Sequence, residues 1–395
     1  MKVLVVCQHY WPEPYPLQDV CDELVRRGHQ VLVVTGVPNY PLGHIYPEYR
    51  KGRNREQTEN GVRIHRCFTI GRRNNVIFRF LNYFSFAISS KLYLRHLKEE
   101  FDVVFTNQTS PVTMSGGAMV YGRKHRKKVV LYCMDLWPAS LAAGGVGERS
   151  LIYRAFGRIS KKIYRAADRI LITSESFRDY LQTQFQIGDD RIVYHPQYAN
   201  VTQIPQRSPD QKNVNLVFAG NIGTAQSIDT ILKAAKHLEE VKQLWWHIVG
   251  DGSELENCKE MAAKLGLSNV IFHGRKPQSE IPEYMAMADG LLLTLTADPV
   301  ISMTLPGKTQ TYMASGKPII AAANGEIPRV IADSCCGFCA PAEDAEALAG
   351  AVRDFMAHPD RRSLGENGKR YYQQHFSRER FMDALEQELD QQAKG

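Results

Sequence analysis

Residues 216–227 read LVFAGNIGTAQS, an apolar run that enters a Gly-x-x-Gly turn and then a polar stretch. The run Leu216–Ala219 has the length and composition of a buried strand, and a helix is expected to begin near Ser227. Glycines let backbone N–H groups approach a ligand closely, and a helix N-terminus favours anions. A Gly-x-x-Gly turn after a strand also occurs without any ligand, so a plain turn stays the alternative at this point.

The succession of a strand and a helix recurs along the sequence. Strand-length apolar runs alternate with amphipathic helical stretches over the whole chain. Before residue 200 these runs are Val3–Cys7, Gln30–Thr35, Val62–His65, Val103–Thr106, Val129–Met134, Arg169–Thr173 and Arg191–His195. After residue 213 they are Leu216–Ala219, Trp245–Val249, Val270–His273, Gly290–Leu295 and Pro318–Ala323. Strands that are apolar on both faces, with helices between them, indicate parallel sheets covered on both sides.

The chain has 395 residues, and domains of ~100–200 residues are usual, so two domains are expected. Residues 200–213 are polar, contain Pro205 and Pro209, and have linker composition. We therefore predict an α/β protein with two doubly wound Rossmann-like parallel-sheet domains, at 1–199 and 214–372, and a ligand cleft between them. Residues 373–395 are expected to form a C-terminal helix that packs back toward the first domain.

Composition narrows the class of protein. Hydrophobic residues make up 44% and charged residues 23%, which are globular values. The first apolar run is shorter than the ~7–15 apolar residues of a signal peptide, and no stretch reaches the ~18–20 that span a bilayer. The eight cysteines are scattered, and Cys335-Cys336-x-x-Cys339 lacks a fourth ligand, so neither disulfides nor a metal site are expected. A cytoplasmic location follows as an expectation.

Residues 304–318 read TLPGKTQTYMASGKP and predict a short helix that begins near Gly307 and ends at Gly316. Lys308 falls in its first turn, where a cation opposes the helix dipole, so its placement suggests a bound anion. A P-loop would require a glycine at position 302, where Ser302 stands, and is excluded.

Ionisable side chains follow two predicted strands at their carboxyl ends, where doubly wound sheets bind ligands. Asp135 follows Val129–Met134, and His9 and Glu13 follow the first strand. All three are suited to acid–base work. Ordinary solvated or capping loop residues are the alternative.

Together these motifs resemble family 4 glycosyltransferases of the GT-B fold, most closely a bacterial O-antigen and capsule branch that transfers N-acetyl-fucosamine-type sugars. The resemblance covers nearly the whole chain. It is carried by Val34-Thr35-Gly36-Val37-Pro38-Asn39-Tyr40-Pro41 with Gly43 and Tyr46, Asp135-Leu136-Trp137-Pro138, Gly220-Asn221-Ile222-Gly223 with Gln226, Pro306-Gly307-Lys308 with Tyr312-Met313-Ala314, and Gly316-Lys317-Pro318.

The resemblance implies a retaining transferase that moves a sugar, an N-acetylated amino- or deoxy-sugar, from a UDP-sugar to a lipid-linked diphosphate saccharide. It implies catalytic or acceptor-orienting roles for Lys308, Asp135, His9 and Glu13, with no metal or other cofactor. The donor-binding residues that it implies are Gly220, Asn221, Ile222, Gly223, Gln226, Gly250, Asp251, Arg275, Lys276, Pro277, Pro306, Gly307, Thr309 and Thr311.

The sequence departs from the usual family pattern at several donor positions. An Arg and a Lys of the Gly-rich region are replaced by Asn221 and Gln226, and two glutamates by Met303 and Thr311. The resembling branch shows similar replacements. More of the diphosphate charge is therefore expected to be met by Lys308 and by helix N-termini, as negative charge builds on the leaving phosphate.

The charge of +7 is unevenly distributed, since residues 51–169 hold 23 basic and 8 acidic residues. Val76–Leu97 predicts a helix that is apolar nearly all round, and 152–169 a basic amphipathic helix; both are typical of membrane surfaces, with a buried helix or a solvated basic face as the alternative. The expected membrane-contact residues are Arg79, Phe80, Phe84, Arg154, Arg158, Lys161, Lys162 and Arg165. A peripheral location on the inner face of the cell membrane is predicted, and no nucleic-acid-binding module is recognised.

Other functions stay open on the sequence alone. They are a transferase with a different nucleotide-sugar and a soluble acceptor, a sugar-nucleotide epimerase, and a non-catalytic sugar-nucleotide-binding protein. An epimerase would turn over the donor without any acceptor.

Overall fold

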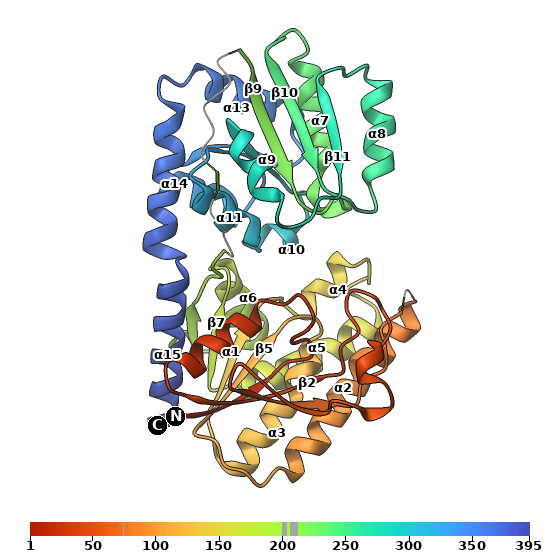
Figure 1. Cartoon of the computed structure of the whole chain (residues 1–395), viewed down its shortest axis with the longest axis vertical. Coiled ribbons are helices and arrows are strands. Elements are labelled where there is room, and N and C mark those ends of the chain that lie inside the picture. The colour runs from red at the N-terminus through yellow and green to blue at the C-terminus, as the bar shows by residue number, and fades with distance from the viewer. Residues whose placement is uncertain (74, 200–203, 206–211) are drawn as a thin grey trace. The chain divides into compact units, whose positions relative to one another are not determined.

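The computed structural model describes residues 1–73, 75–199, 204–205 and 212–395, which form two compact units (Figure 1). The first unit comprises Met1–His195 with Met382–Gly395, and the second Pro196–Phe381. These bounds differ from the expected 1–199 and 214–372. Most of the expected linker 200–213 lies outside the described residues.

The first unit is built on an eight-stranded sheet of order β3-β4-β2-β1-β5-β6-β7-β8, parallel except where β3 pairs with β4. Its strands are β1 Lys2–Val6, β2 Gln30–Gly36, β3 Glu56–Glu59, β4 Val62–Cys67, β5 Val103–Gln108, β6 Val129–Cys133, β7 Arg169–Ile172 and β8 Ile192–Tyr194. Its helices are α1 Leu17–Arg26, α2 Val76–His96, α3 Gly116–His125, α4 Ala139–Ala143, α5 Leu151–Ala166 and α6 Ser176–Phe185. Each predicted strand before residue 200 is present because its β-branched and leucine side chains are buried between helices.

The second unit is built on a six-stranded parallel sheet of order β11-β10-β9-β12-β13-β14. Its strands are β9 Val214–Ala219, β10 Leu244–Val249, β11 Val270–Gly274, β12 Gly290–Thr294, β13 Ile319–Ala322 and β14 Gly337–Ala340. Its helices are α7 Ile228–His237, α8 Leu255–Lys264, α9 Ile281–Met287, α10 Pro299–Ser302, α11 Gly307–Ser315, α12 Glu326–Ser334, α13 Ala345–Ala357 and α14 Arg361–His375. The prediction of two doubly wound parallel-sheet domains is thus confirmed.

The C-terminal segment differs in form from the single expected helix 373–395. Phe376 is buried with non-helical backbone angles and separates α14 from α15, Arg378–Lys394. Glu386 of α15 accepts hydrogen bonds at 2.7 Å from both Arg27 and His29, and Glu388 accepts one at 2.8 Å from Arg169. Ion pairs therefore attach the end of α15 to the first sheet's helices and strands.

Two short strands escaped the sequence analysis. Glu56–Glu59 is an edge strand of polar residues and gives no apolar run. Gly337–Ala340 is an edge strand of four residues that are mostly half-buried. Among the helices of the described residues, none is both long and apolar enough to cross a bilayer.

Candidate active site

Two glycine-rich loops extend the second sheet beyond the carboxyl ends of β9 and β10. The Gly220 N–H donates to the carbonyl of Val249 and the Ile222 N–H to that of Asp251, both at 2.9 Å. The loops therefore continue the strand pairing past the sheet edge, with backbone groups ordered where a ligand is expected.

This close approach requires glycine. A Cβ on Gly250, which has φ +147°, would lie 1.8 Å from the Gly220 carbonyl oxygen, and one on Gly252 would lie 2.2 Å from that of Ile222. Any side chain at either position would separate the loops.

The loops border a pocket of about 600 Å³, to which the loop after β11 also contributes. The residues that line it are Gly220, Asn221, Val249, Gly250, Asp251, Gly252, Arg275, Lys276, Gln278 and Ile281. Six of the fourteen predicted donor residues thus lie together. Gln278 and Ile281 were missed because they belong to no recognisable motif.

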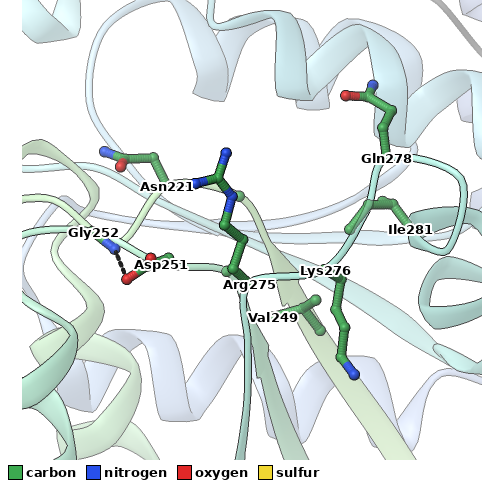
Figure 2. Close-up of a pocket in the computed structure, with 10 residues that line it drawn as sticks. Asn221, Val249, Asp251, Gly252, Arg275, Lys276, Gln278 and Ile281 are labelled. Carbon is green, nitrogen blue, oxygen red and sulfur yellow. Dashed lines mark hydrogen bonds between the residues drawn. The ribbon is translucent and has the colours of Figure 1, made fainter. Parts of the chain in front are cut away.

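The two cations of this pocket point in different directions (Figure 2). Arg275 extends toward Asn221, whereas Lys276 turns away and places its Nζ 5.8 Å from the ring centroid of Tyr284. Arg275 is exposed, and no carboxylate of the described residues pairs with its guanidinium. Arg275 is therefore the pocket cation that is free to meet an anion.

Lys308 lies beside the same pocket, in the first turn of α11. Its Nζ is 3.5 Å from the ring centroid of Phe218, and a Cβ on Gly220 would lie 2.8 Å from that nitrogen. Burial lowers the pKa of the Lys308 ammonium to about 7. Within the described parts of the chain no carboxylate neutralises it, so a bound anion would restore its charge.

Tyr312 holds α11 against β9. Its hydroxyl accepts a hydrogen bond from the Ala219 N–H at 3.0 Å and lies 3.3 Å from the Ala219 carbonyl oxygen, to which it donates. Tyr312 stands one helical turn after Lys308 and is fully buried. Tyr312 thus fixes the helix that carries Lys308 against β9, a contact that the sequence did not reveal.

Several predicted donor residues are held inside the loops. The Gln226 side chain accepts hydrogen bonds from the Asn221 amide at 3.1 Å and the Gly223 N–H at 3.2 Å. The Thr311 hydroxyl donates to the Gly307 carbonyl at 2.9 Å. These contacts shape the loop and the helix start.

Four further predicted donor residues lie in the protein interior or next to the pocket cations and the start of α11. The side chains of Ile222 and Thr309 are fully buried, so Ile222 contributes through its backbone. Pro277 follows the two pocket cations, and Pro306 precedes the first residue of α11.

In the first unit, His9 and Glu13 form a buried pair after β1. His9 Nδ1 lies 2.8 Å from Glu13 Oε2, and Glu13 Oε1 accepts hydrogen bonds at 2.7 Å from the N–H groups of Asn39 and Tyr40. The His9 ring stacks on Tyr15 at 4.9 Å. With both oxygens engaged, Glu13 orients His9 and the loop at Asn39, and His9 remains the candidate to contact a ligand.

Asp135 lies apart from this pair, after β6. Its Oδ2 accepts a hydrogen bond at 2.8 Å from Ser110, whose hydroxyl oxygen accepts one from the Trp137 indole. Burial raises the pKa of the Asp135 carboxyl. Because β5 lies between β1 and β6, Asp135 and His9 follow strands that lie about 10 Å apart.

No metal centre is formed by the described residues, in which no three His, Cys, Asp or Glu side chains gather in a suitable cluster. All eight cysteines are free thiols.

The helix α2 exposes its apolar side. Ile77 is 66% exposed, Ile88 57% and Leu92 55%, and Leu81 and Phe84 continue the same stripe. The polar residue Asn82 is turned inward instead: it is fully buried, accepts a hydrogen bond from Gln8 and donates one to the Ile70 carbonyl. Of the other expected contacts on this helix, Arg79 is exposed and Phe80 half-buried.

The helix α5 carries an exposed row of cations. Arg154, Arg158, Lys162 and Arg165 are exposed and Lys161 is half-buried. Arg165 is already engaged, because it donates to the Phe185 carbonyl at 2.9 Å. At the start of α5, Leu151 and Ile152 are exposed, so apolar and basic side chains share this surface.

Comparison with protein families gives a consistent result for both units. Residues 16–197 match the family described as "Glycosyl transferase 4-like domain", and residues 201–371 match "Glycosyl transferases group 1".

Two curated relatives match the chain at low identity, one over about two thirds of its length and one over nearly all of it. The Pseudomonas aeruginosa protein WbjE, named as a glycosyltransferase, is 28% identical over 264 residues, which is 63% of this chain and 65% of that protein. The Escherichia coli K12 protein WcaI, named as a colanic acid biosynthesis glycosyl transferase, is 23% identical over 388 residues, 91% of this chain and 93% of its own length.

Solved structures support the GT-B fold. Sucrose-phosphate synthase from Thermosynechococcus elongatus aligns with a TM-score of 0.74 at 18% identity, over 99% of this chain and 98% of its own. HepE of Anabaena, solved with UDP and glucose, aligns with a TM-score of 0.69 at 15% identity, over 99% of both chains.

Proposed function

Because this chain belongs to the group 1 and 4-like glycosyltransferase families, we propose that it transfers a sugar from a UDP-sugar to a lipid-linked diphosphate saccharide in bacterial surface polysaccharide synthesis. The names of WbjE and WcaI support the glycosyltransferase class, and that of WcaI supports a polysaccharide product. The proposed sugar is an N-acetylated amino- or deoxy-sugar, transferred with retention of configuration.

The observation that carries the donor part of the proposal is the environment of Lys308. Its ammonium lies against Phe218 and Gly220, at the N-terminus of α11 and beside the pocket. No carboxylate of the described residues pairs with it. A diphosphate would supply the missing charge and accept hydrogen bonds from the loop N–H groups.

Arg275 can supply the positive charge that is missing from this loop, where Asn221 and Gln226 replace the usual cations. Its guanidinium projects from the loop after β11 toward Asn221, the position that a loop cation occupies in the resembling family. We infer that Arg275 and Lys308 divide the diphosphate charge between them, so that no resident metal is needed for this task.

The chemistry follows from these groups. As the bond between the sugar and the β-phosphate breaks, negative charge grows on the phosphate, and Lys308 stabilises it. In the proposed retaining reaction the acceptor hydroxyl attacks from the face that the phosphate leaves, and the phosphate oxygen receives the hydroxyl proton. His9 and Asp135 would then orient the acceptor.

The proposed acceptor is held at a membrane surface. The exposed stripe of Ile77, Leu81 and Ile88 on α2 has the apolar character of an interfacial helix, and α5 adds cations. Nearby anionic lipids contribute roughly 1 kcal/mol per basic residue, so peripheral docking on the inner face of the cell membrane needs few contacts.

The transfer is tested with a panel of UDP- and GDP-sugars and a membrane extract as the acceptor source. Mass spectrometry should show one sugar added to a lipid-linked saccharide, and NMR of the product should show the anomeric configuration of the donor. Inversion would contradict the retaining mechanism. Conversion of the donor to another sugar nucleotide without acceptor would favour an epimerase, and donor binding without turnover a binding protein.

The membrane part is tested by flotation with anionic liposomes at low salt. Leu81→Ser with Ile88→Ser should reduce the floated fraction severalfold, because it removes two exposed apolar contacts. Ile271→Ser is the matched control, since Ile271 is an exposed apolar residue of the second unit. Equal flotation of all three proteins would refute the role of α2.

A further inference from the structure

A groove of about 820 Å³ in the first unit is bordered by α2, α3 and α5. Its lining changes along α2, where Phe84 and Ile88 precede Lys91. Phe84 and Ile88 form the apolar half of the groove, and Lys91 with Lys162 of α5 forms its basic half.

The basic half brings together lysines from different helices. A Cβ on Gly116 would lie 2.4 Å from Cε and 2.9 Å from Nζ of Lys91, so the Lys91 side chain lies directly over this glycine. Burial, and then the nearby charge of Lys162, lower the pKa of the Lys91 ammonium. Asp168, the acidic residue of the lining, pairs with Lys128 at 3.1 Å, and no carboxylate of the described residues pairs with Lys91 or Lys162.

The apolar half is continuous with the outer surface of α2. Phe84 and Ile88 line the groove and also belong to the exposed stripe of that helix. A ligand that fits both halves has an anionic head and a hydrocarbon tail. Neither His9 nor Asp135 lines this groove, so the head is not the reacting diphosphate.

We propose that this groove binds one anionic phospholipid, with its phosphate between Lys91 and Lys162 and an acyl chain along Phe84 and Ile88. The bound lipid anchors the chain and does not react. This inference is independent of which sugar the protein transfers.

The test is native mass spectrometry of the full chain released from micelles that contain phosphatidylglycerol or phosphatidylcholine. One phosphatidylglycerol should be retained per chain, at least tenfold more tightly than phosphatidylcholine. Lys91→Glu and Lys162→Glu should each weaken retention at least tenfold. Lys51→Glu makes the same charge change at an exposed lysine of the same unit outside the groove lining, and should stay within twofold of the native chain.

A second variant tests the acyl chain. Phe84→Ser removes an exposed aromatic side chain from the apolar half, and should weaken lipid retention at least tenfold while leaving the binding of inorganic phosphate unchanged. Thermal melting confirms that each variant is folded, and UDP binding is measured in parallel.

Four results would overturn the proposal. They are no retained lipid while UDP still binds, equal retention of the two lipids, an equal loss in Lys51→Glu, and glycerol phosphate binding as tightly as phosphatidylglycerol. The first leaves the proposed sugar transfer intact, because the donor site is then shown to work without the groove.

Discussion

Lys308 should make donor binding depend steeply on pH, because the free ammonium has a pKa of about 7 and a bound diphosphate would raise it. In the free protein about nine-tenths of Lys308 is charged at pH 6 and about one-hundredth at pH 9. If the bound diphosphate returns the pKa close to its ordinary value of 10.5, the Kd for a UDP-sugar rises roughly 100-fold between these pH values.

The assay is isothermal titration calorimetry with a UDP-sugar, whose diphosphate has no proton to lose in this range. At pH 8, buffers of different ionisation enthalpy should reveal uptake of about 0.9 proton per donor bound, the fraction of Lys308 that is neutral beforehand. Lys308→Met should bind at least tenfold more weakly at pH 6, with a flat pH profile and no proton uptake. Lys264→Met is the control, because Lys264 is an exposed lysine of the same unit.

The same burial has a consequence for stability with the opposite sign. A lysine whose folded pKa is lowered favours the folded state more at high pH, and the folded state loses this advantage as the pH falls from 10.5 toward 7. Lys308→Met should therefore raise the free energy of unfolding at pH 7 while it weakens donor binding. A native pH profile as flat as that of Lys308→Met, or a destabilised Lys308→Met, would refute the reasoning.

Three further changes can be tested in the same assays. Tyr312→Phe removes the hydroxyl that bonds to Ala219; donor Kd should rise severalfold and unfolding free energy fall by about 1 kcal/mol, and an unchanged Kd would contradict its positioning role. Arg275→Ala should raise the donor KM about tenfold, whereas Lys276→Ala, whose side chain points away, should change it less than twofold; equal effects would mean that both cations meet the donor. Burial lowers the pKa of His195 to about 3, so the unfolded chain binds the extra proton below pH 6.5, and unfolding free energy should fall by about 2 kcal/mol from pH 7 to 5. In denaturant titrations, the unfolding free energy of His195→Asn should depend less on pH between 7 and 5 than that of the native chain. An identical pH dependence would exclude His195 as its source.

The strands were predictable because buried parallel strands must be apolar on both faces. An uninterrupted apolar run such as Val3–Val6 meets that requirement, and its side chains are fully buried. Edge strand Glu56–Glu59 was not predictable, since a strand exposed at a sheet edge carries no hydrophobic signature. The same limit applies to α2: its composition showed an apolar helix, but only packing showed that Asn82 faces inward and Ile88 outward.

For the candidate site, local sequence was enough to predict a residue that meets an anion. A lysine in the first turn of a helix, after a glycine and before a glycine stop, opposes the helix dipole wherever the helix lies. Arg275 was named for its loop, although the direction of its side chain could not be known.

By itself, then, the sequence determined the two doubly wound sheets and the glycosyltransferase families that its two parts match, because these depend on periodicity and on short motifs. It also predicted the anion site at Lys308. Tertiary structure alone decided that Lys308 rests on Phe218 and Gly220, and that Glu13 is occupied by the loop at Asn39. It also decided that Lys91 and Lys162 share one groove. These facts join residues 26 to 90 positions apart, and such pairs meet only when strand order and helix packing bring their elements together.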